Sequence, residues 1–224
     1  MVDDVAGEVA DRLVRAAEAG GHVALTGGST PGVAYERAAD AGADWTGSVM
    51  WLGDDRCVPP DDDRSNYKLA KERLLDRMEP ARWPRVERIL GELGPDPAAD
   101  DYEARLKEHV GGEIPMLDLI LLGLGPDGHC APIFPGKPAM AVTGRAVVGV
   151  PEAGLEPFVP RVTMTLPLLN AGRDVLFMVT GEGKADAVAR AFGGDPRPDT
   201  PASYVRPPKL TVVLDSGAAC KLNL

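Results

Sequence analysis

The stretch Leu117-Asp-Leu-Ile-Leu-Leu-Gly-Leu-Gly-Pro-Asp-Gly-His-Cys130 indicates the class of fold. Its first six residues are almost all apolar, which is typical of a strand in a parallel sheet whose two faces are both covered by helices. A loop rich in glycine follows directly. Ligands of open α/β sheets bind outside the carboxyl ends of the strands, so this order of strand and loop marks a candidate site.

Strand and helix patterns alternate on both sides of this stretch. We expect further strands at residues 22–26, 48–52, 88–90, 146–150, 161–165, 174–180 and 210–214. We expect helices at about residues 5–17, 30–41, 67–78, 96–106 and 184–192, the second with Thr30 as its N-cap. This alternation predicts an α/β fold with one doubly wound, mostly parallel, Rossmann-like sheet and helices on both faces. A single domain over residues 1–224 is expected.

The composition indicates a folded globular protein with few classes of partner. The 224 residues are 44% hydrophobic and 26% charged, near the globular average. A net charge of −10 opposes binding to nucleic acid or to an anionic membrane, and no apolar run approaches the ~20 residues that span a bilayer. The acidic start Met1-Val2-Asp3-Asp4 favours a cytoplasmic protein.

The three cysteines give no sign of a disulfide framework or of a zinc site. Cys57, Cys130 and Cys220 are odd in number and form no Cys-x-x-Cys pair. We therefore expect reduced thiols and no metal.

Four polar loops each follow an expected strand. They cover residues 27–31, 54–56, 123–129 and 181–184. Because parallel strands end at the same edge of a sheet, these loops are expected to converge on one site.

The loop Gly27-Gly28-Ser29-Thr30-Pro31 suits a phosphate. Its glycines allow close approach to the main chain, its hydroxyls add donors, and a helix N-terminus follows. An ordinary tight turn is the alternative. The serine-hydrolase pattern Gly-x-Ser-x-Gly does not fit, since Pro31 stands at its last glycine.

The loop after Leu122 formally matches the dinucleotide pattern Gly-x-Gly-x-x-Gly. Pro126 breaks the helix which that pattern requires. The loop instead presents Asp127 and His129, and a carboxylate near an imidazole suits a general base. The other two histidines, His22 and His109, are expected to be structural or solvated.

Three cations are candidates for binding an anion. Arg56 follows Asp54-Asp55, and a guanidinium can bind a carboxylate, a phosphate or a developing oxyanion; a solvated charge cluster is the alternative. Lys184 lies at the start of a helix, where a cation is electrostatically disfavoured unless an anion binds there. Arg161 opens a strand and is equally consistent with a solvated edge position.

At these loops the chain resembles the 6-phosphogluconolactonases, within the larger group typified by glucosamine-6-phosphate deaminase. The matching segments are Leu25-Thr-Gly-Gly-Ser-Thr-Pro31, Trp51-Leu-Gly-Asp-Asp-Arg-Cys-Val-Pro59 with Ser65-Asn66-Tyr67, residues 118–136, and Arg161-Val-Thr-Met-Thr-Leu-Pro167 with Leu169-Asn170 and Gly181-x-x-Lys184. Where this family has Asp-Glu-Arg the chain has Asp54-Asp55-Arg56, and where it has Gly-His-Thr-Ala-Ser the chain has Gly128-His129-Cys130-Ala131-Pro132. The deaminases typically have a tyrosine in place of Arg56 and Asn-Glu-Pro near residues 133–136.

The resemblance implies hydrolysis of 6-phospho-D-glucono-1,5-lactone in the oxidative pentose phosphate pathway. It implies catalytic roles for His129, Asp127 and Arg56. The substrate-binding residues that it implies are Gly27, Gly28, Ser29, Thr30, Asp54, Arg161 and Lys184. No metal or organic cofactor is expected, and the partner is expected to be the phosphorylated sugar lactone, bound by a monomer or weak homo-oligomer.

Three other functions stay open at this point. A glucosamine-6-phosphate deaminase or isomerase shares the glycine loops. A non-catalytic sugar-phosphate sensor would keep the phosphate loop without an acid-base pair. A nicotinamide-dependent oxidoreductase is suggested only by the formal glycine pattern.

Overall fold

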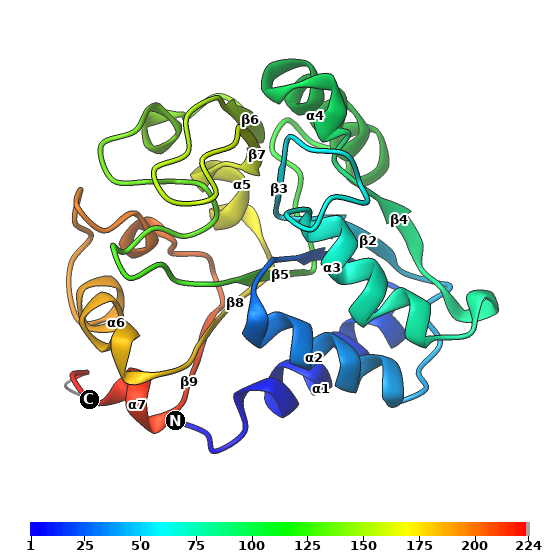
Figure 1. Ribbon diagram of the computed structural model, residues 1–224, viewed down its shortest axis with the longest axis horizontal. Coiled ribbons are helices and arrows are strands. Elements are labelled where there is room, and N and C mark those ends of the chain that lie inside the picture. Colours follow the sequence, from blue (N-terminus) through cyan, green and yellow to red (C-terminus); the bar gives the residue numbers. More distant parts are fainter. Residues whose placement is uncertain (223–224) are drawn as a thin grey trace.

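Six parallel strands form the central sheet, in the spatial order β4-β2-β1-β5-β8-β9 (Figure 1). The computed structural model describes residues 1–222. The strands are β1 (His22–Leu25), β2 (Val49–Leu52), β4 (Arg85–Glu87), β5 (Leu119–Leu122), β8 (Asp174–Val179) and β9 (Leu210–Leu214). The chain adds strands outward from β1 in one direction and then from β5 in the other. The point between β1 and β5 is therefore the topological switch point, where such sheets bind ligands.

Helices cover both faces of this sheet, as the doubly wound fold requires. One face carries α1 (Val5–Glu18) and α2 (Ser29–Asp40), against which α3 (Asn66–Arg73) packs. The other face carries α4 (Pro95–Val110), α5 (Leu166–Ala171) and α6 (Ala185–Phe192), and the short α7 (Ser216–Ala219) lies beside α6 near the end of the chain (Figure 1). The predicted fold class is confirmed.

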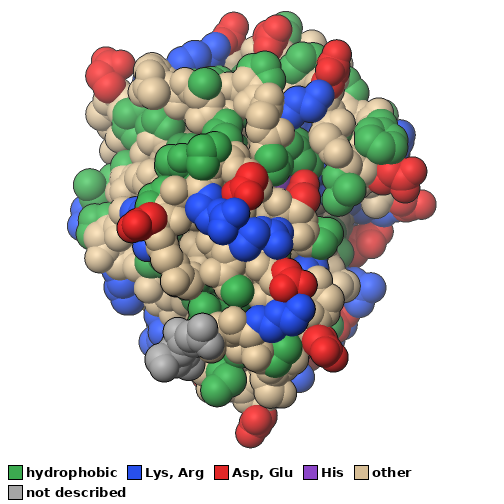
Figure 2. Space-filling model, turned by 90° about the vertical axis from the view of Figure 1, so that its left-hand side faces the viewer, with side chains coloured by type: hydrophobic (Ala, Val, Ile, Leu, Met, Phe, Trp, Pro, Cys, Tyr) green, Lys and Arg blue, Asp and Glu red, His purple; other side chains and the backbone are tan. Residues whose placement is uncertain are grey.

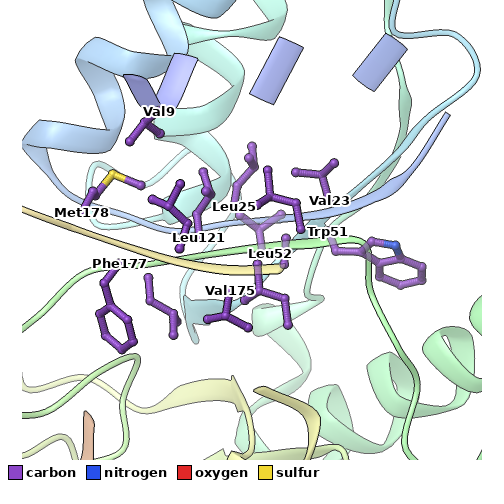
Figure 3. Close-up of a cluster of buried hydrophobic side chains, with 14 of the residues drawn as sticks. Val9, Val23, Leu25, Trp51, Leu52, Leu121, Val175, Phe177 and Met178 are labelled. Carbon is purple, nitrogen blue, oxygen red and sulfur yellow. The ribbon is translucent and has the colours of Figure 1, made fainter. Parts of the chain in front are cut away.

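Side chains from the sheet fill both of the layers that the helices close. Val9 of α1 lies with Leu25, Leu121 and Met178 on one side of the strands, and Phe177 points to the other side (Figure 3). There the ring of Phe177 meets that of Phe192 in α6 with 5.1 Å between centroids. Each such buried apolar side chain contributes about 1.5–3 kcal/mol to folding. Successive residues of a strand point to opposite faces of the sheet, so a shift by one residue would turn these side chains out of their layers. Their burial therefore fixes the register of the strands.

A second, three-stranded antiparallel sheet lies beside α4, in the order β3-β7-β6. It is formed by β3 (Asp54–Arg56), β6 (Val147–Val150) and β7 (Arg161–Met164). The segment 54–56 was expected to be a loop, and this expectation is wrong. Gly53 N–H donates to Leu25 O at 2.8 Å, and Gly53 O accepts from Met164 N–H at 2.9 Å, so the chain passes from one sheet into the other at this glycine.

Several boundaries differ from those predicted, and two helices, α5 and α7, were not predicted. The helix α3 ends at Arg73 rather than at residue 78, and α4 extends to Val110 rather than to residue 106. The fourth strand of the chain is β4 at residues 85–87 rather than 88–90, because its polar residue Glu87 is paired with Arg105 at 2.6 Å and can be buried. The helix α2 begins at Ser29 after Gly28, and the Thr30 hydroxyl bonds to Thr180 Oγ1 at 3.0 Å instead of capping the helix.

Charged side chains of both signs share the surface. On the face drawn in Figure 2, lysine and arginine side chains lie next to acidic ones. Ion pairs of this kind include Arg197 with Asp199 and Lys221 with Asp186, both at 2.9 Å. None of the helices in residues 1–222 has the length and apolar character needed to cross a membrane.

Candidate active site

A cavity of about 350 Å³ opens at the carboxyl edge of the central sheet, over the switch point. Its wall comes from the segments that follow β1, β2, β5 and β8, together with β3 and β7. Of the ten predicted site residues, nine line it: Gly27, Gly28, Ser29, Thr30, Asp54, Arg56, His129, Arg161 and Lys184. The tenth, Asp127, lies directly behind His129. The topology thus brings together the four segments that the sequence placed at one edge, although one of them, 54–56, is a strand and not a loop.

The glycine loop after β1 is held rigidly at its start. The hydroxyl of the buried Tyr35 accepts from Thr26 N–H at 2.9 Å and donates to Thr26 O at 2.6 Å. Gly28 has a φ of +122°, which side-chain-bearing residues rarely adopt. The N-terminus of α2 therefore faces the cavity with main-chain donors and its partial positive charge, the arrangement that binds phosphate.

Lys184 reaches the same cavity from the segment between β8 and α6. Its Nζ donates to Leu124 O at 2.9 Å, which uses one of three donors. Burial lowers the pKa of Lys184, and the negative charge of Asp127 partly opposes this shift. Within residues 1–222 no carboxylate lies at ion-pairing distance from this ammonium. It is thus a half-buried cation able to accept an anion from the cavity.

His129 and Asp127 form a tight pair in the loop after β5. Nδ1 of His129 lies 2.5 Å from Asp127 Oδ1, and this oxygen also accepts the His129 main-chain N–H at 3.2 Å. Burial raises the pKa of Asp127, but the hydrogen bond and the charge of His129 outweigh it and bring the pKa below its usual value. Because Nδ1 is engaged, Nε2 is the nitrogen left for a molecule in the cavity.

The loop geometry depends on Gly125 and Gly128. A Cβ at Gly125 would lie 2.1 Å from His129 Nδ1, and one at Gly128 would lie 2.8 Å from a methyl carbon of Thr200. No helix begins between residues 123 and 137. The loop is therefore built to seat the imidazole, and it lacks the helix start on which a dinucleotide fingerprint depends.

Two arginines stand side by side on the small sheet. Arg56 of β3 is the register partner of Arg161 of β7. Arg161 donates to Leu155 O and Pro157 O, both at 3.1 Å, and Arg56 donates to Arg64 O. The Nε atoms of both arginines are buried without a partner among the described residues. Both residues line the cavity, so these guanidinium groups leave donor capacity there.

Asp54 lies near the positive charges of these arginines and of His129. It is 6% exposed, and burial raises its pKa despite the opposing charges of Arg56, Arg161 and His129. A carboxylate in this position offsets two like charges that would otherwise repel each other. The cluster therefore has cations that can face an anion and a counter-charge that keeps them together.

Asn66 and Thr180 also line the cavity, although the sequence analysis assigned them no role. Thr180 directly follows β8 and bonds to Thr30. The sequence predicted no role for Asn66 beyond the match of Ser65-Asn66-Tyr67 to the family. The serine before it could have indicated its position, because Ser65 is the N-cap of α3 and Asn66 is therefore the first residue of that helix.

The cysteines and the other histidines lie outside this chemistry. All three thiols are free. Burial raises the pKa of Cys130 to about 12 and that of Cys57 to about 11, so neither is an activated thiolate. His22 Nδ1 accepts from Trp51 Nε1–H at 3.0 Å, and neither His22 nor His109 lines the cavity. In residues 1–222 no group of three metal-binding side chains comes together.

Known proteins resemble this chain over most of its length. The family model described as glucosamine-6-phosphate isomerases/6-phosphogluconolactonase matches residues 1–214. The 6-phosphogluconolactonase of Homo sapiens is 38% identical over 185 residues, covering 81% of this chain and 70% of that protein. The 6-phosphogluconolactonase of Mycobacterium leprae (strain TN) is 38% identical over 209 residues, covering 89% and 84%.

A solved structure extends the likeness to three dimensions. The structure of 6-phosphogluconolactonase from Trypanosoma brucei matches with a TM-score of 0.85 at 26% identity, covering 98% of this chain and 95% of that one. The resemblance inferred from the motifs is confirmed. The chain belongs to the family of glucosamine-6-phosphate isomerases and 6-phosphogluconolactonases.

Proposed function

We propose that this chain is a single-domain 6-phosphogluconolactonase, which hydrolyses 6-phospho-D-glucono-1,5-lactone to 6-phospho-D-gluconate in the oxidative pentose phosphate pathway. The observation that carries the proposal is the convergence in one cavity of an anion site at Lys184 and an imidazole–carboxylate pair at His129. The relatives described above carry the same name.

The proposed reaction needs one general base and one anion-stabilising group. Nε2 of His129 takes a proton from water as its oxygen forms a bond to C1, and the carbonyl electrons move to the exocyclic oxygen. Arg56 stabilises that oxyanion. When the carbonyl re-forms, the bond from C1 to the ring oxygen breaks, and His129 returns its proton to this oxygen. The released acid then ionises in water.

Asp127 acts on the reaction through His129. Its carboxylate fixes the imidazole so that Nε2 faces the cavity, and it stabilises the imidazolium that forms after proton transfer. Asp54 and Arg161 support Arg56 at the same end of the cavity. Since a lactone is an activated ester, we propose that these groups suffice and that no metal or organic cofactor takes part.

The other end of the cavity would hold the 6-phosphate. Gly27, Gly28, Ser29 and Thr30 supply main-chain and hydroxyl donors, and Lys184 supplies the charge. Binding energy from a group remote from C1 would then orient the lactone at His129. We also propose that the protein acts in the cytoplasm as a monomer or weak homo-oligomer, with this small molecule and no nucleic acid or membrane as its partner.

A coupled assay tests the proposal. Glucose-6-phosphate dehydrogenase generates the lactone, and acid release is followed with and without the chain, because the lactone also opens spontaneously. We expect a rate well above the spontaneous one with wild type and a rate near it with His129→Ala. A chain that releases ammonia from glucosamine 6-phosphate but leaves the lactone untouched would be a deaminase instead.

A further inference from the structure

Asn66 joins two of the segments that form the wall of the cavity. It is the first residue of α3, it is 3% exposed, and it lines the cavity wall. On one side lies Gly27 of the glycine loop, and on the other lies Asp54 of β3. It therefore contacts both the anion-binding part and the part that holds the reacting groups.

The main chain of Asn66 is fixed by the buried carboxylate of Asp55. This carboxylate accepts the N–H groups of Arg56 and Asn66, both at 2.7 Å, and that of Tyr67 at 3.1 Å. It also accepts the Ser65 hydroxyl at 3.1 Å. Four donors from two separate elements thus meet at one side chain, so α3 begins at a fixed position relative to β3.

The amide of Asn66 is then held in one orientation. Its Nδ2 donates to Asp54 O at 2.9 Å. Its Oδ1 points at Gly27, where a Cβ atom would lie only 2.0 Å away. The φ of Gly27 lies outside the left-handed region, so the close approach of Asn66 is what requires glycine there. The amide is wedged between the loop and the strand.

The amide oxygen keeps its hydrogen-bonding capacity. Among the described residues none donates a hydrogen bond to Asn66 Oδ1. This oxygen is not sealed from solvent, so it can accept a hydrogen bond from a molecule in the cavity. An acceptor on the wall between a phosphate site and a carbonyl site would meet the hydroxyl groups that separate C6 from C1 in a sugar lactone. A site that accepts a hydrogen bond from a substrate hydroxyl discriminates strongly against molecules without it.

We propose that Asn66 is a positioning and specificity-determining residue, which sets the separation between the phosphate loop and the Asp54–Arg56 strand and accepts a hydrogen bond from a ring hydroxyl of the substrate. This inference rests on the proposed lactonase activity. It assigns to Asn66 a role in turnover, since phosphate binding itself depends on Lys184 and the glycine loop.

The first test compares Asn66→Ala with Asn170→Ala. Asn170 also ties main-chain groups together, through Tyr204 O at 3.0 Å and Arg206 N at 2.5 Å, but it lies outside the cavity wall. We expect Asn66→Ala to lower kcat/KM by about tenfold to a hundredfold, the size of one or two lost polar contacts, mainly through kcat. Asn170→Ala should affect thermal stability and leave kcat/KM within about twofold.

The second test asks whether Gly27 and Asn66 are coupled. Gly27→Ala places a methyl group on the Asn66 amide and should lower both the melting temperature and the affinity for inorganic phosphate, measured by calorimetry. Adding Asn66→Ala removes the obstructing amide. The double variant should therefore recover melting temperature and phosphate affinity relative to Gly27→Ala, while its kcat stays as low as that of Asn66→Ala.

The outcomes separate this inference from the activity on which it rests. Wild-type kcat/KM in Asn66→Ala, or a double variant no better than Gly27→Ala, would overturn the role of Asn66 while the lactonase stands. A wild-type chain that does not hydrolyse the lactone would refute the proposed function and the turnover role with it. The phosphate-affinity and melting measurements on the double variant still report the coupling in that case.

Discussion

In the loop after β5, Asp127 holds His129 by two contacts from one oxygen: Oδ1 lies 2.5 Å from the imidazole Nδ1 and accepts the main-chain N–H of the same residue at 3.2 Å. The two residues are only two positions apart, so the pair is set by the loop itself. The side chain of His129 is 17% exposed, which leaves Nε2 access to the cavity.

Removal of this imidazole should abolish most of the turnover. We expect His129→Ala to lower kcat by about 10²–10⁴, the usual contribution of a general base. Asp127→Asn should fall between this variant and wild type, since the base remains but is less well oriented. His109→Ala, outside the cavity, is the control and should keep full turnover. Near-wild-type kcat in His129→Ala would refute general-base catalysis by this residue.

Two glycines of the same loop offer a matched pair. A Cβ at Gly125 would lie 2.1 Å from His129 Nδ1, whereas one at Gly123 would meet nothing within 4 Å. We therefore expect Gly125→Ala to displace the imidazole and to lower kcat by at least tenfold, and Gly123→Ala to leave kcat within about twofold. Steady-state kinetics and circular dichroism measure both variants. Equal behaviour of the two would mean that the imidazole position does not control turnover.

The ammonium of Lys184 should matter for binding. Lys184→Met is expected to raise KM by about tenfold to a hundredfold, the value of a charge-assisted contact. The substitution removes the hydrogen bond to Leu124 O, but it also removes the free-energy cost of burying a charged ammonium. Since these two effects on the free energy of unfolding oppose each other, the melting temperature should change by no more than about 4 °C. Lys221→Met, at an exposed ion pair, serves as the control.

The unphosphorylated lactone should be a poor substrate of wild type, and equally fast hydrolysis of both lactones would remove the phosphate site from the mechanism.

The lowered pKa of Lys184 also gives a pH dependence with a definite sign. A lysine carries its charge below its pKa, so a lowered pKa means that the charge is lost at a lower pH than the usual value of about 10.4. As the pH is raised, affinity for 6-phosphogluconate should therefore begin to fall before the pH reaches that usual value. Lys184→Arg keeps its charge and should bind evenly over the same range. The product is the right probe, because the lactone ester opens spontaneously in alkali, and identical profiles for the two proteins would contradict this origin of the pH dependence.

Arg56 should act on the transition state more than on binding. If its guanidinium stabilises the oxyanion, Arg56→Met lowers kcat by more than it raises KM. Arg64→Met is a neighbouring control, since Arg56 contacts only the main-chain carbonyl of that residue. A rise in KM with unchanged kcat would assign Arg56 to ground-state anion binding.

Local sequence patterns determined much of this structure. The apolar run 117–122 and the alternation of elements predicted a doubly wound parallel sheet, because burial of both faces leaves a hydropathy signal within each strand. The same reasoning predicted that four loops would meet at one edge, since parallel strands must all end there. His129 and Asp127 could be paired from the sequence because two residues in one loop are close whatever the rest of the chain does.

Other relationships depend on contacts between distant segments, and only the tertiary structure decided them. Arg56 and Arg161 are neighbours because β3 and β7 pair in a separate antiparallel sheet, and no pattern within either segment specifies this register. Asn66 meets Gly27 because Asp55 fixes the start of α3 against β3. Such contacts arise when whole elements pack against one another, so the residues that divide the cavity and set its dimensions leave no periodic signal in the sequence.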